Sequence, residues 1–437
     1  MLNRAFLSGG AAIALAFTLL AGSGCSKSSS TGPGGGGAGS VITVSGKVIY
    51  TNGTSVAGIP VVVTGLASTN TDANGNFSIA NVTTPYDIAV VDGTNKSAIM
   101  YRGLTRSDPT LVYVSTLLAV GHTGSISGKI SGGDFTPNQG ATDVTQVAFG
   151  SPETGSSGVT GANGAFGPVN LSWYGPTVTT GNLYALQIQN DVTPPNLPVA
   201  YKGYGVKTGI AVNDGSSLTN QFDTLQAVGT GQFTATVSLP AGYAFTQKSL
   251  FLRFSPTTLL PLLSENTTAT SLTYNTPTVT GASLLLGIRA QGAGAIAYAY
   301  KVGLSPGATG VAVSVPAAPG LSLPINGATG VDTTFTFSWT AYPGGIHVFF
   351  VRAPGYPTFY VLTAGTSTRI PNLKAVGLPL PSSAVYTWQA VGFAPFASAD
   401  AAAGPAGFFA AGSGSPYGLT ADASAASSAP WTFTTAP

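Results

Sequence analysis

The stretch TDANGNF at residues 71–77 decides the fold, because the chain repeats it as TGANGAF at residues 160–166. In both copies an Asn-Gly pair predicts a tight hairpin turn, since these residues accept the positive φ angles that such turns need. The phenylalanine two residues after the glycine is expected to return to the core face of the next strand. The sequence therefore indicates a β unit that occurs at least twice.

Four further landmarks accompany the turn, in the same order in both copies. They are residues 44–48 with 126–130, 86–90 with 184–188, 101–104 with 201–204, and 116–121 with 224–229. Residues 86–90 alternate along the strand, which predicts a strand with one buried face. A third, degenerate copy without the Asn-Gly turn is expected from residue 231 to residue 316, where only the sandwich fold is predicted.

The low charge of the chain favours strands over helices. Asp, Glu, Lys and Arg make up 7% of the residues, against about 25% in an average soluble protein. Helices generally cover their outer faces with these residues, so their scarcity predicts an all-β protein. The net charge of +2 and the lack of a basic run argue against nucleic acid as a partner. A single cysteine excludes an internal disulfide.

The first copy resembles the carboxypeptidase regulatory-like family. The residues that carry the likeness are SGKVIY, AGIPVVVTG, TDANGNFSIANV and YDIAVV, all within residues 41–120, and residues 122–228 match less well. The resemblance implies a seven-stranded, transthyretin-like β-sandwich. Such domains are accessory or spacer modules, so the resemblance also implies a role other than catalysis.

After a Pro-rich joint at residues 316–319, the last part of the chain resembles a fibronectin type III-like domain. Trp339 stands in its second strand, Tyr386 and Trp388 in its sixth, and Trp431 in its last. The expected fold is thus a series of tandem antiparallel β-sandwich domains. The expected layout is a signal peptide at 1–24, a lipidated cysteine and linker at 25–40, and domains at 41–121, 122–228, 229–316 and 317–437.

The N-terminus resembles a bacterial lipoprotein signal. Arg4 precedes an apolar segment at residues 11–20, and small residues at 21–24 lead to Cys25, the only cysteine. The resemblance implies cleavage before Cys25 and lipidation of its thiol, so the membrane becomes a partner. Ordinary secretion and an uncleaved anchor are the alternatives. Because Ser26 is not aspartate, the outer membrane is expected in a two-membrane bacterium, with the periplasmic or surface face left open.

Residues for catalysis are few. The two histidines, His122 and His347, have no nucleophile motif around them, and the chain has too few His and Cys residues for a zinc site. The two glutamates, Glu153 and Glu265, lie in polar segments, and no pair of carboxylates is singled out. We therefore expect no catalytic residue and no cofactor.

One short stretch could hold a metal ion. Asp72, Asn74 and Asn76 place oxygen side chains at alternate positions, as at the start of a calcium loop. The rest of such a loop and its closing glutamate are missing. An Asn-Gly turn explains the same residues and is the preferred interpretation.

A long connection at residues 392–430 departs from the fibronectin pattern, where a short hairpin is usual. It contains only two charges, Asp400 and Asp422, among small residues. Its aromatic side chains are candidates for contact with a sugar ring or an apolar partner. They are Phe393, Phe396, Phe408, Phe409 and Tyr417. The leading interpretation is that the connection folds back over its own sheet, with partner contact and disorder as alternatives.

Together these features predict a non-catalytic cell-envelope lipoprotein. Its expected role is that of a structural or adhesive spacer, a rod that presents its C-terminal domain outward. The first alternative is a carbohydrate-binding accessory lipoprotein that uses the aromatic connection. The second is a hydrolase with an unrecognised carboxylate site. Besides the membrane, a polysaccharide or another envelope protein is the expected partner.

Overall fold

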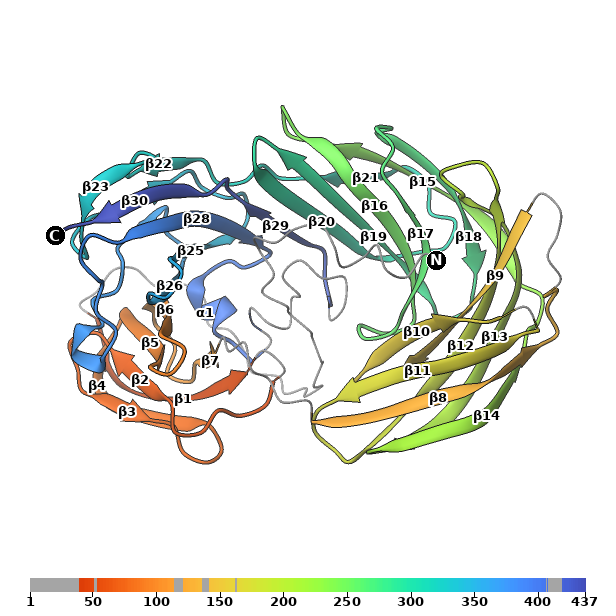
Figure 1. The fold of residues 1–437 in the computed structure, drawn as a ribbon, viewed down its shortest axis with the longest axis horizontal. Helices are drawn as coiled ribbons and strands as arrows, with labels where there is room; N and C mark the ends of the chain where they lie inside the picture. Colours follow the sequence, from red (N-terminus) through yellow and green to blue (C-terminus); the bar gives the residue numbers. More distant parts are fainter. Residues whose placement is uncertain are drawn as a thin grey trace.

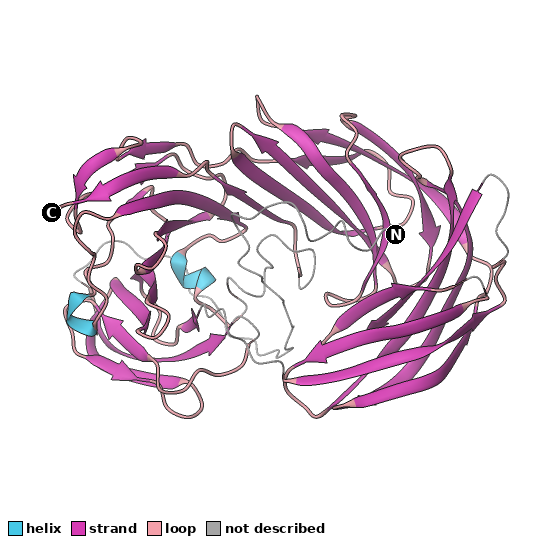
Figure 2. Cartoon of the chain, in the orientation of Figure 1, coloured by secondary structure: helices cyan, strands magenta, loops and turns pink. Residues whose placement is uncertain are grey.

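The computed structural model describes residues 39–50, 53–113, 121–135, 141–161, 163–405, 407 and 419–437. Nearly all regular structure in this part of the chain is β-strand (Figure 2). The two helical segments are short, η1 (Lys374–Val376) and α1 (Ala399–Ala402), and neither is long and apolar enough to cross a membrane. The protein is all-β, as the low charge predicts.

The first seven strands form a two-sheet sandwich, here called unit 1. They are β1 (Val41–Tyr50), β2 (Pro60–Val63), β3 (Ser68–Asn70), β4 (Asn76–Thr83), β5 (Tyr86–Asp92), β6 (Ser97–Leu104) and β7 (Thr110–Tyr113). One sheet has the order β4-β1-β7, and the other has β3-β2-β5-β6. Val44 and Val48 of β1 are fully buried between them.

Unit 2 repeats this strand order, with sheets β11-β8-β14 and β10-β9-β12-β13. Its strands are β8 (His122–Ser131), β9 (Ala141–Gly150), β10 (Gly155–Val159), β11 (Ala165–Trp173), β12 (Val178–Asp191), β13 (Pro198–Asn213) and β14 (Ser216–Thr224). In both units the first strand pairs antiparallel with the fourth and parallel with the seventh.

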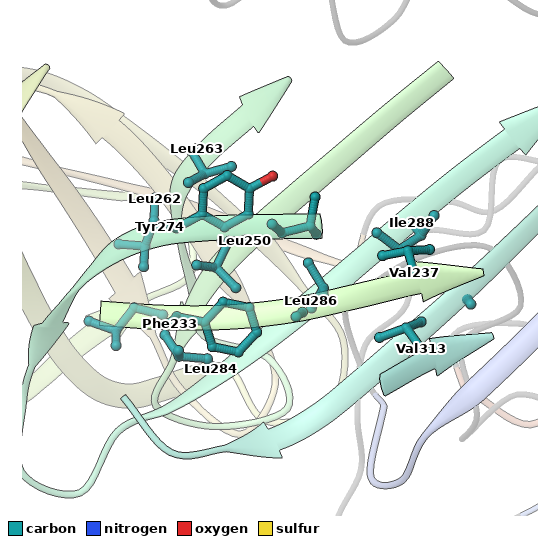
Figure 3. Close-up of a cluster of buried hydrophobic side chains, with 14 of the residues drawn as sticks. Phe233, Val237, Leu250, Leu262, Leu263, Tyr274, Leu284, Leu286, Ile288 and Val313 are labelled. Carbon is teal, nitrogen blue, oxygen red and sulfur yellow. The ribbon is translucent and has the colours of Figure 1, made fainter. Parts of the chain in front are cut away.

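Unit 3 has the same order a third time, although its sequence lacks the Asn-Gly turn. Its sheets are β18-β15-β21 and β17-β16-β19-β20. The strands are β15 (Gly229–Ser238), β16 (Ala244–Arg253), β17 (Leu259–Glu265), β18 (Ser271–Thr278), β19 (Ser283–Gly292), β20 (Ala295–Leu304) and β21 (Val311–Ser314). Figure 3 shows its core, where Phe233 and Val237 of β15 pack with Leu250, Leu284 and Leu286 from the other sheet.

Unit 4 has a different order. Its strands are β22 (Leu321–Leu323), β23 (Ala328–Val331), β24 (Phe337–Trp339), β25 (Ile346–Arg352), β26 (Thr358–Thr363), β27 (Ser367–Thr368), β28 (Val385–Ala394), β29 (Ala423–Ser427) and β30 (Trp431–Thr435). The sheet β22-β24-β27 covers β25, β26, β28 and β30. Phe337 lies at the centre of an aromatic core, with ring centroids 4.7 Å from Phe349 and 5.1 Å from Trp388.

The repeated Asn-Gly turn has a different role from the predicted one. It does not close a hairpin, because β3 and β4 belong to different sheets, so the turn carries the chain from one sheet to the other. The positive φ is confined to Gly75 and Gly164, at 77° and 76°. A Cβ at Gly75 would lie 2.6 Å from the Val48 carbonyl oxygen, so only glycine fits. Phe77 returns to the core, 5% exposed, as predicted.

The units are not arranged as a rod. The four-stranded sheets of units 3 and 1 join through unit 4 in the continuous order β17-β16-β19-β20-β29-β28-β25-β26-β6-β5-β2-β3. In Figure 1 the first and last parts of the chain, orange and blue, lie together on one side, and units 2 and 3 lie on the other. The expectation of a rod with an outward C-terminal domain is wrong, because unit 4 pairs directly with unit 1.

Packing between units also corrects the prediction of half-buried strands. In β5, all residues from Ile88 to Asp92 are buried, and in β12 the same holds from Ala185 to Ile188. Side chains on one face pack into the sandwich of their own unit, and those on the other face pack against a neighbouring unit. Both faces of these sheets are therefore core.

Candidate functional site

The aromatic candidates for partner contact belong to residues 392–430, of which the structure describes a part. Phe408, Phe409 and Tyr417 lie outside the described residues, as does Cys25. Phe396 is 7% exposed and lies in the core cluster of unit 1. Phe393 is half-buried against the same cluster. A ring as buried as that of Phe396 is not available for stacking on a sugar.

A one-turn helix follows Phe396 and packs on unit 1. Ser398 caps the start of α1, and its Oγ accepts a hydrogen bond from the Ala401 N–H at 3.1 Å. Ala399, Ala402 and Ala403 are buried in the cluster that contains the β1 valines. The connection therefore completes the core of unit 1, a neighbour that the sequence analysis did not anticipate.

Asp400 fastens this helix to the loop between β6 and β7. Its carboxylate accepts the backbone N–H of Thr105 at 2.9 Å and of Arg106 at 3.2 Å, and the Thr105 hydroxyl donates to it as well. Arg106 Nη1 donates to the Asp400 carbonyl oxygen at 2.8 Å, and Thr110 N–H donates to the Ala403 carbonyl oxygen at 2.7 Å. We call these five residues the Asp400 clasp.

Replacing Asp400 with alanine is expected to cost about 2 kcal/mol of unfolding free energy, because hydrogen bonds to a charged group contribute about 1.5–3 kcal/mol. Hydrogen exchange should rise at the Thr105 and Arg106 amides. Asp422→Ala is the matched control, since that carboxylate contacts unit 3 and should leave those amides protected. Unchanged exchange at Thr105 in Asp400→Ala would show that the clasp contributes little.

The described end of the connection, from residue 419 onward, is attached to unit 3. Leu419 is 1% exposed and packs with Leu285 on the outer face of the unit 3 sheet. Asp422 forms an ion pair with Lys301 at 2.7 Å and accepts the Val302 N–H at 3.0 Å. β29 then pairs with both β28 and β20. The described parts of the connection thus link unit 4 to two other units.

Units 1 and 4 are joined through β6 and β26. Five residues of each strand pair in parallel, from Ser97 with Thr358 to Tyr101 with Leu362. Tyr101 and Leu362 face a core shared with β1 and α1. Met100 and Val361, on the opposite face, lie in the aromatic core of unit 4. Both cores therefore contain side chains from both units.

Units 2 and 3 meet through aromatic packing. Phe254 stacks on Tyr184 with ring centroids 3.9 Å apart and lies 5.9 Å from Tyr204. The Tyr201 hydroxyl donates to the Asn275 carbonyl oxygen at 3.0 Å. Tyr201 corresponds to Tyr101 in the repeat, so the same strand position meets another unit in both copies, unit 3 for Tyr201 and unit 4 for Tyr101.

The calcium candidate has the geometry of a turn. Asp72 Oδ1 accepts the N–H groups of Asn74 and Asn76, both at 2.8 Å, and Oδ2 accepts from Asn76 Nδ2 at 3.2 Å. These hydrogen bonds, with that from the Asn76 N–H the largest contribution, lower the pKa of Asp72. The described residues include no cluster of three or more His, Cys, Asp or Glu side chains.

Glu265 is buried at the end of β17, although it lies in a polar segment of the sequence. Its Oε1 lies 3.0 Å from Nζ of Lys248, a residue with no exposed surface, and also accepts from the Tyr274 hydroxyl. Burial raises the pKa of Glu265, but hydrogen bonds from Tyr274 and Lys248 outweigh it, so the net shift is downward. Glu153, in the turn after β9, accepts from Thr179 at 2.7 Å.

The two histidines have separate structural roles. His347 is 1% exposed, its Nε2 accepts the Tyr342 N–H at 2.9 Å, and burial lowers its pKa. His122 Nδ1 lies 3.0 Å from Asp214, and the hydrogen bond to this carboxylate raises the His122 pKa. They lie in units 4 and 2, so the structure does not bring them together.

Comparisons with known proteins give no family for this chain. No protein-family model matches it, and no curated protein is significantly similar. Among solved structures, the Bacillus anthracis TIE protein matches with 11% identity and a TM-score of 0.15, over 63% of this chain and 50% of that one. The fimbrial anchor protein Mfa2 from Porphyromonas gingivalis matches with 10% identity and a TM-score of 0.17, over 38% and 77%. TM-scores this low carry no argument about fold or function.

The described structure defines the class of protein as a set of β-sandwiches joined through shared sheets and cores. The residues that build the junctions include Asp400, Asp422 and Phe254, which the sequence analysis did not select. A signal was present for two of them. Asp400 and Asp422 are the only charges in residues 392–430, and each forms a contact to a different unit.

Proposed function

We propose that this protein is a non-catalytic lipoprotein of the cell envelope that acts as a rigid structural and adhesive scaffold. The observation that carries this proposal is the connection at residues 392–430. Its described parts fasten unit 4 to unit 1 through the Asp400 clasp and to unit 3 through β29 and Asp422. Such contacts resist separation of the units, which is what a load-bearing or presenting protein requires.

Attachment is proposed to come from the N-terminus. Lipid on Cys25 would hold the chain to a membrane, and residues 26–40, rich in Ser and Gly, would act as a flexible linker. The outer membrane is the proposed destination in a two-membrane bacterium. The body would then present the surfaces of its sandwiches to a polysaccharide or another envelope protein.

Replacing Cys25 with serine is expected to move the protein from the membrane fraction to the soluble fraction, because no thiol remains to accept lipid. Labelling with an alkyne fatty acid should be lost in the same variant. Ser26→Ala, which keeps the cysteine, serves as the matched control. Membrane association of Cys25→Ser equal to that of the wild type would contradict the anchor.

The scaffold is tested by small-angle X-ray scattering of the soluble Cys25→Ser protein. The expected profile is that of one compact body with units 1 and 4 in contact. A profile of four separated units in an extended chain would contradict the rigid scaffold without affecting the anchor.

A further inference from the structure

Unit 1 is connected to the rest of the described structure in an unusual way. Its strand pairing, its interunit hydrogen bonds and its shared hydrophobic clusters all lead to unit 4. Unit 2 comes next in the sequence, yet none of the hydrogen bonds, pairings or clusters found among the described residues joins units 1 and 2. Residues 114–120, which join the two units in the sequence, lie outside the described residues.

The surface that unit 1 offers to unit 4 is incomplete without its partner. β6 would be an edge strand in an isolated unit 1, and β26 would be one in an isolated unit 4. Unpaired edges of this kind are templates for pairing with another chain. Separation would also expose Met100 and Ala98 of β6, which are buried in the core of unit 4.

We propose that unit 1 of one copy can dock on unit 4 of a second copy, through the same β6–β26 pairing and Asp400 clasp. The occupant of the surface is thus another molecule of this chain. Every contact is chemically identical in the exchanged form, so the exchange changes only which chain supplies each partner. This inference goes beyond the scaffold proposal and does not depend on Cys25 or its lipid.

Concentration decides between the two forms. Within one chain, the effective concentration of unit 1 near unit 4 favours the closed monomer in dilute solution. Between chains, crowding of many copies favours exchange, which is a low-cost route to oligomers. Two copies that exchange reciprocally form a dimer, and copies that exchange head to tail form longer chains.

The pairing of β6 with β26 allows the exchange to be tested by disulfide formation. Ser97 and Thr358 are paired residues of β6 and β26 and are both half-buried, so cysteines placed there lie within disulfide range. The wild-type mature chain has no cysteine other than Cys25. In the Cys25→Ser background, Ser97→Cys and Thr358→Cys proteins each carry a single thiol.

The experiment mixes the two single-cysteine proteins, unfolds them in urea, refolds them together and oxidises them. A mixed disulfide between the two proteins is expected, at roughly 10-fold the yield of the control mixture and rising with protein concentration. The control pairs Ser97→Cys with Ser217→Cys, an exposed position on β14 of unit 2. Intact mass distinguishes the mixed dimer from the two symmetric ones.

Two outcomes would overturn the proposal. One is a mixed disulfide yield equal to that of the control at every concentration. The other outcome applies if the cysteine variants fail to fold. In that case the Cys25→Ser protein is refolded at increasing concentration, and a protein that stays entirely monomeric by light scattering would overturn the proposal. A dimer fraction that grows with refolding concentration supports exchange without any cysteine introduced at the junction.

Discussion

Replacing Lys248 with methionine is expected to lower the unfolding free energy by about 3–5 kcal/mol, because one partner of a buried ion pair is left without the other. Lys248 has no exposed surface. Besides Glu265, its Nζ donates to Thr267 Oγ1 at 2.8 Å and to the Ala269 carbonyl oxygen at 2.9 Å. The remaining Glu265 carboxylate would keep its hydrogen bonds from Tyr274 and Thr267 but lose the cation.

The double variant Lys248→Met/Glu265→Gln removes both charges and should recover most of that loss, since replacing a whole buried pair is often close to neutral. Lys301→Met is the matched surface control. Its ion pair with Asp422 is partly exposed, so its loss should cost less than about 1 kcal/mol. Urea unfolding at neutral pH measures all three. A double variant as unstable as the single one would show that the charge pair is not the cause.

At acidic pH, the difference in unfolding free energy between the wild type and Lys248→Met should become smaller. The pKa of Glu265 is lowered in the folded wild type. Its contribution to stability is therefore present above the ordinary carboxyl pKa and is lost as the pH falls through the folded pKa. In Lys248→Met, protonation instead neutralises an unpaired buried carboxylate. The two unfolding free energies should thus converge between neutral and acidic pH.

Replacing Leu362 with aspartate is expected to destabilise units 1 and 4 together, by roughly 4 kcal/mol or more, because it buries an unpaired charge. Leu362 lies on β26, has no exposed surface and pairs with Tyr101 of unit 1. The core it enters contains side chains from both units. Hydrogen exchange should therefore increase in β5 and β6 of unit 1 as well as in unit 4.

Phe149→Ala is the control that separates this coupling from a general loss of stability. Phe149 is fully buried, and its core cluster belongs to unit 2 alone. The substitution should cost about 3–5 kcal/mol and leave exchange in β6 nearly unchanged. Persistent protection of unit 1 in Leu362→Asp would mean that units 1 and 4 fold independently, against the shared core described above.

The repeat was predictable because short sequence motifs specify it. Gly75 and Gly164 occupy positions where no other side chain fits, and Phe77 and Phe166 follow them into the core. The third unit keeps the strand order without the turn, because burial of leucines such as Leu284 and Leu286 can direct the same two sheets. The strand order of these units therefore does not depend on the Asn-Gly turn from which the repeat was recognised.

The junctions were not predictable in the same way, because pairing between distant strands has no local signal. One sequence pattern, the continuous apolar run, did indicate which strands are buried on both faces. β6 contains the run Ala98, Ile99, Met100 and Tyr101, all buried, and β19 is buried almost throughout. Continuous apolar runs indicate strands buried on both faces, whereas alternation indicates one buried face. They indicate that a second layer exists, but not which unit supplies it.

The place of the Asp400 clasp in the chain sets an order of events during synthesis. Thr105 cannot donate its hydrogen bond to Asp400 until that residue, which follows it by 295 residues, has been synthesised. At about 5–20 residues per second, translation alone takes on the order of 15–60 seconds to cover that distance. Until β26 is made, the outer edge of β6 has no partner strand, and until α1 is made the core of unit 1 lacks the alanines that complete it. A newly made chain therefore completes unit 1 only after residues of unit 4 have been added to it.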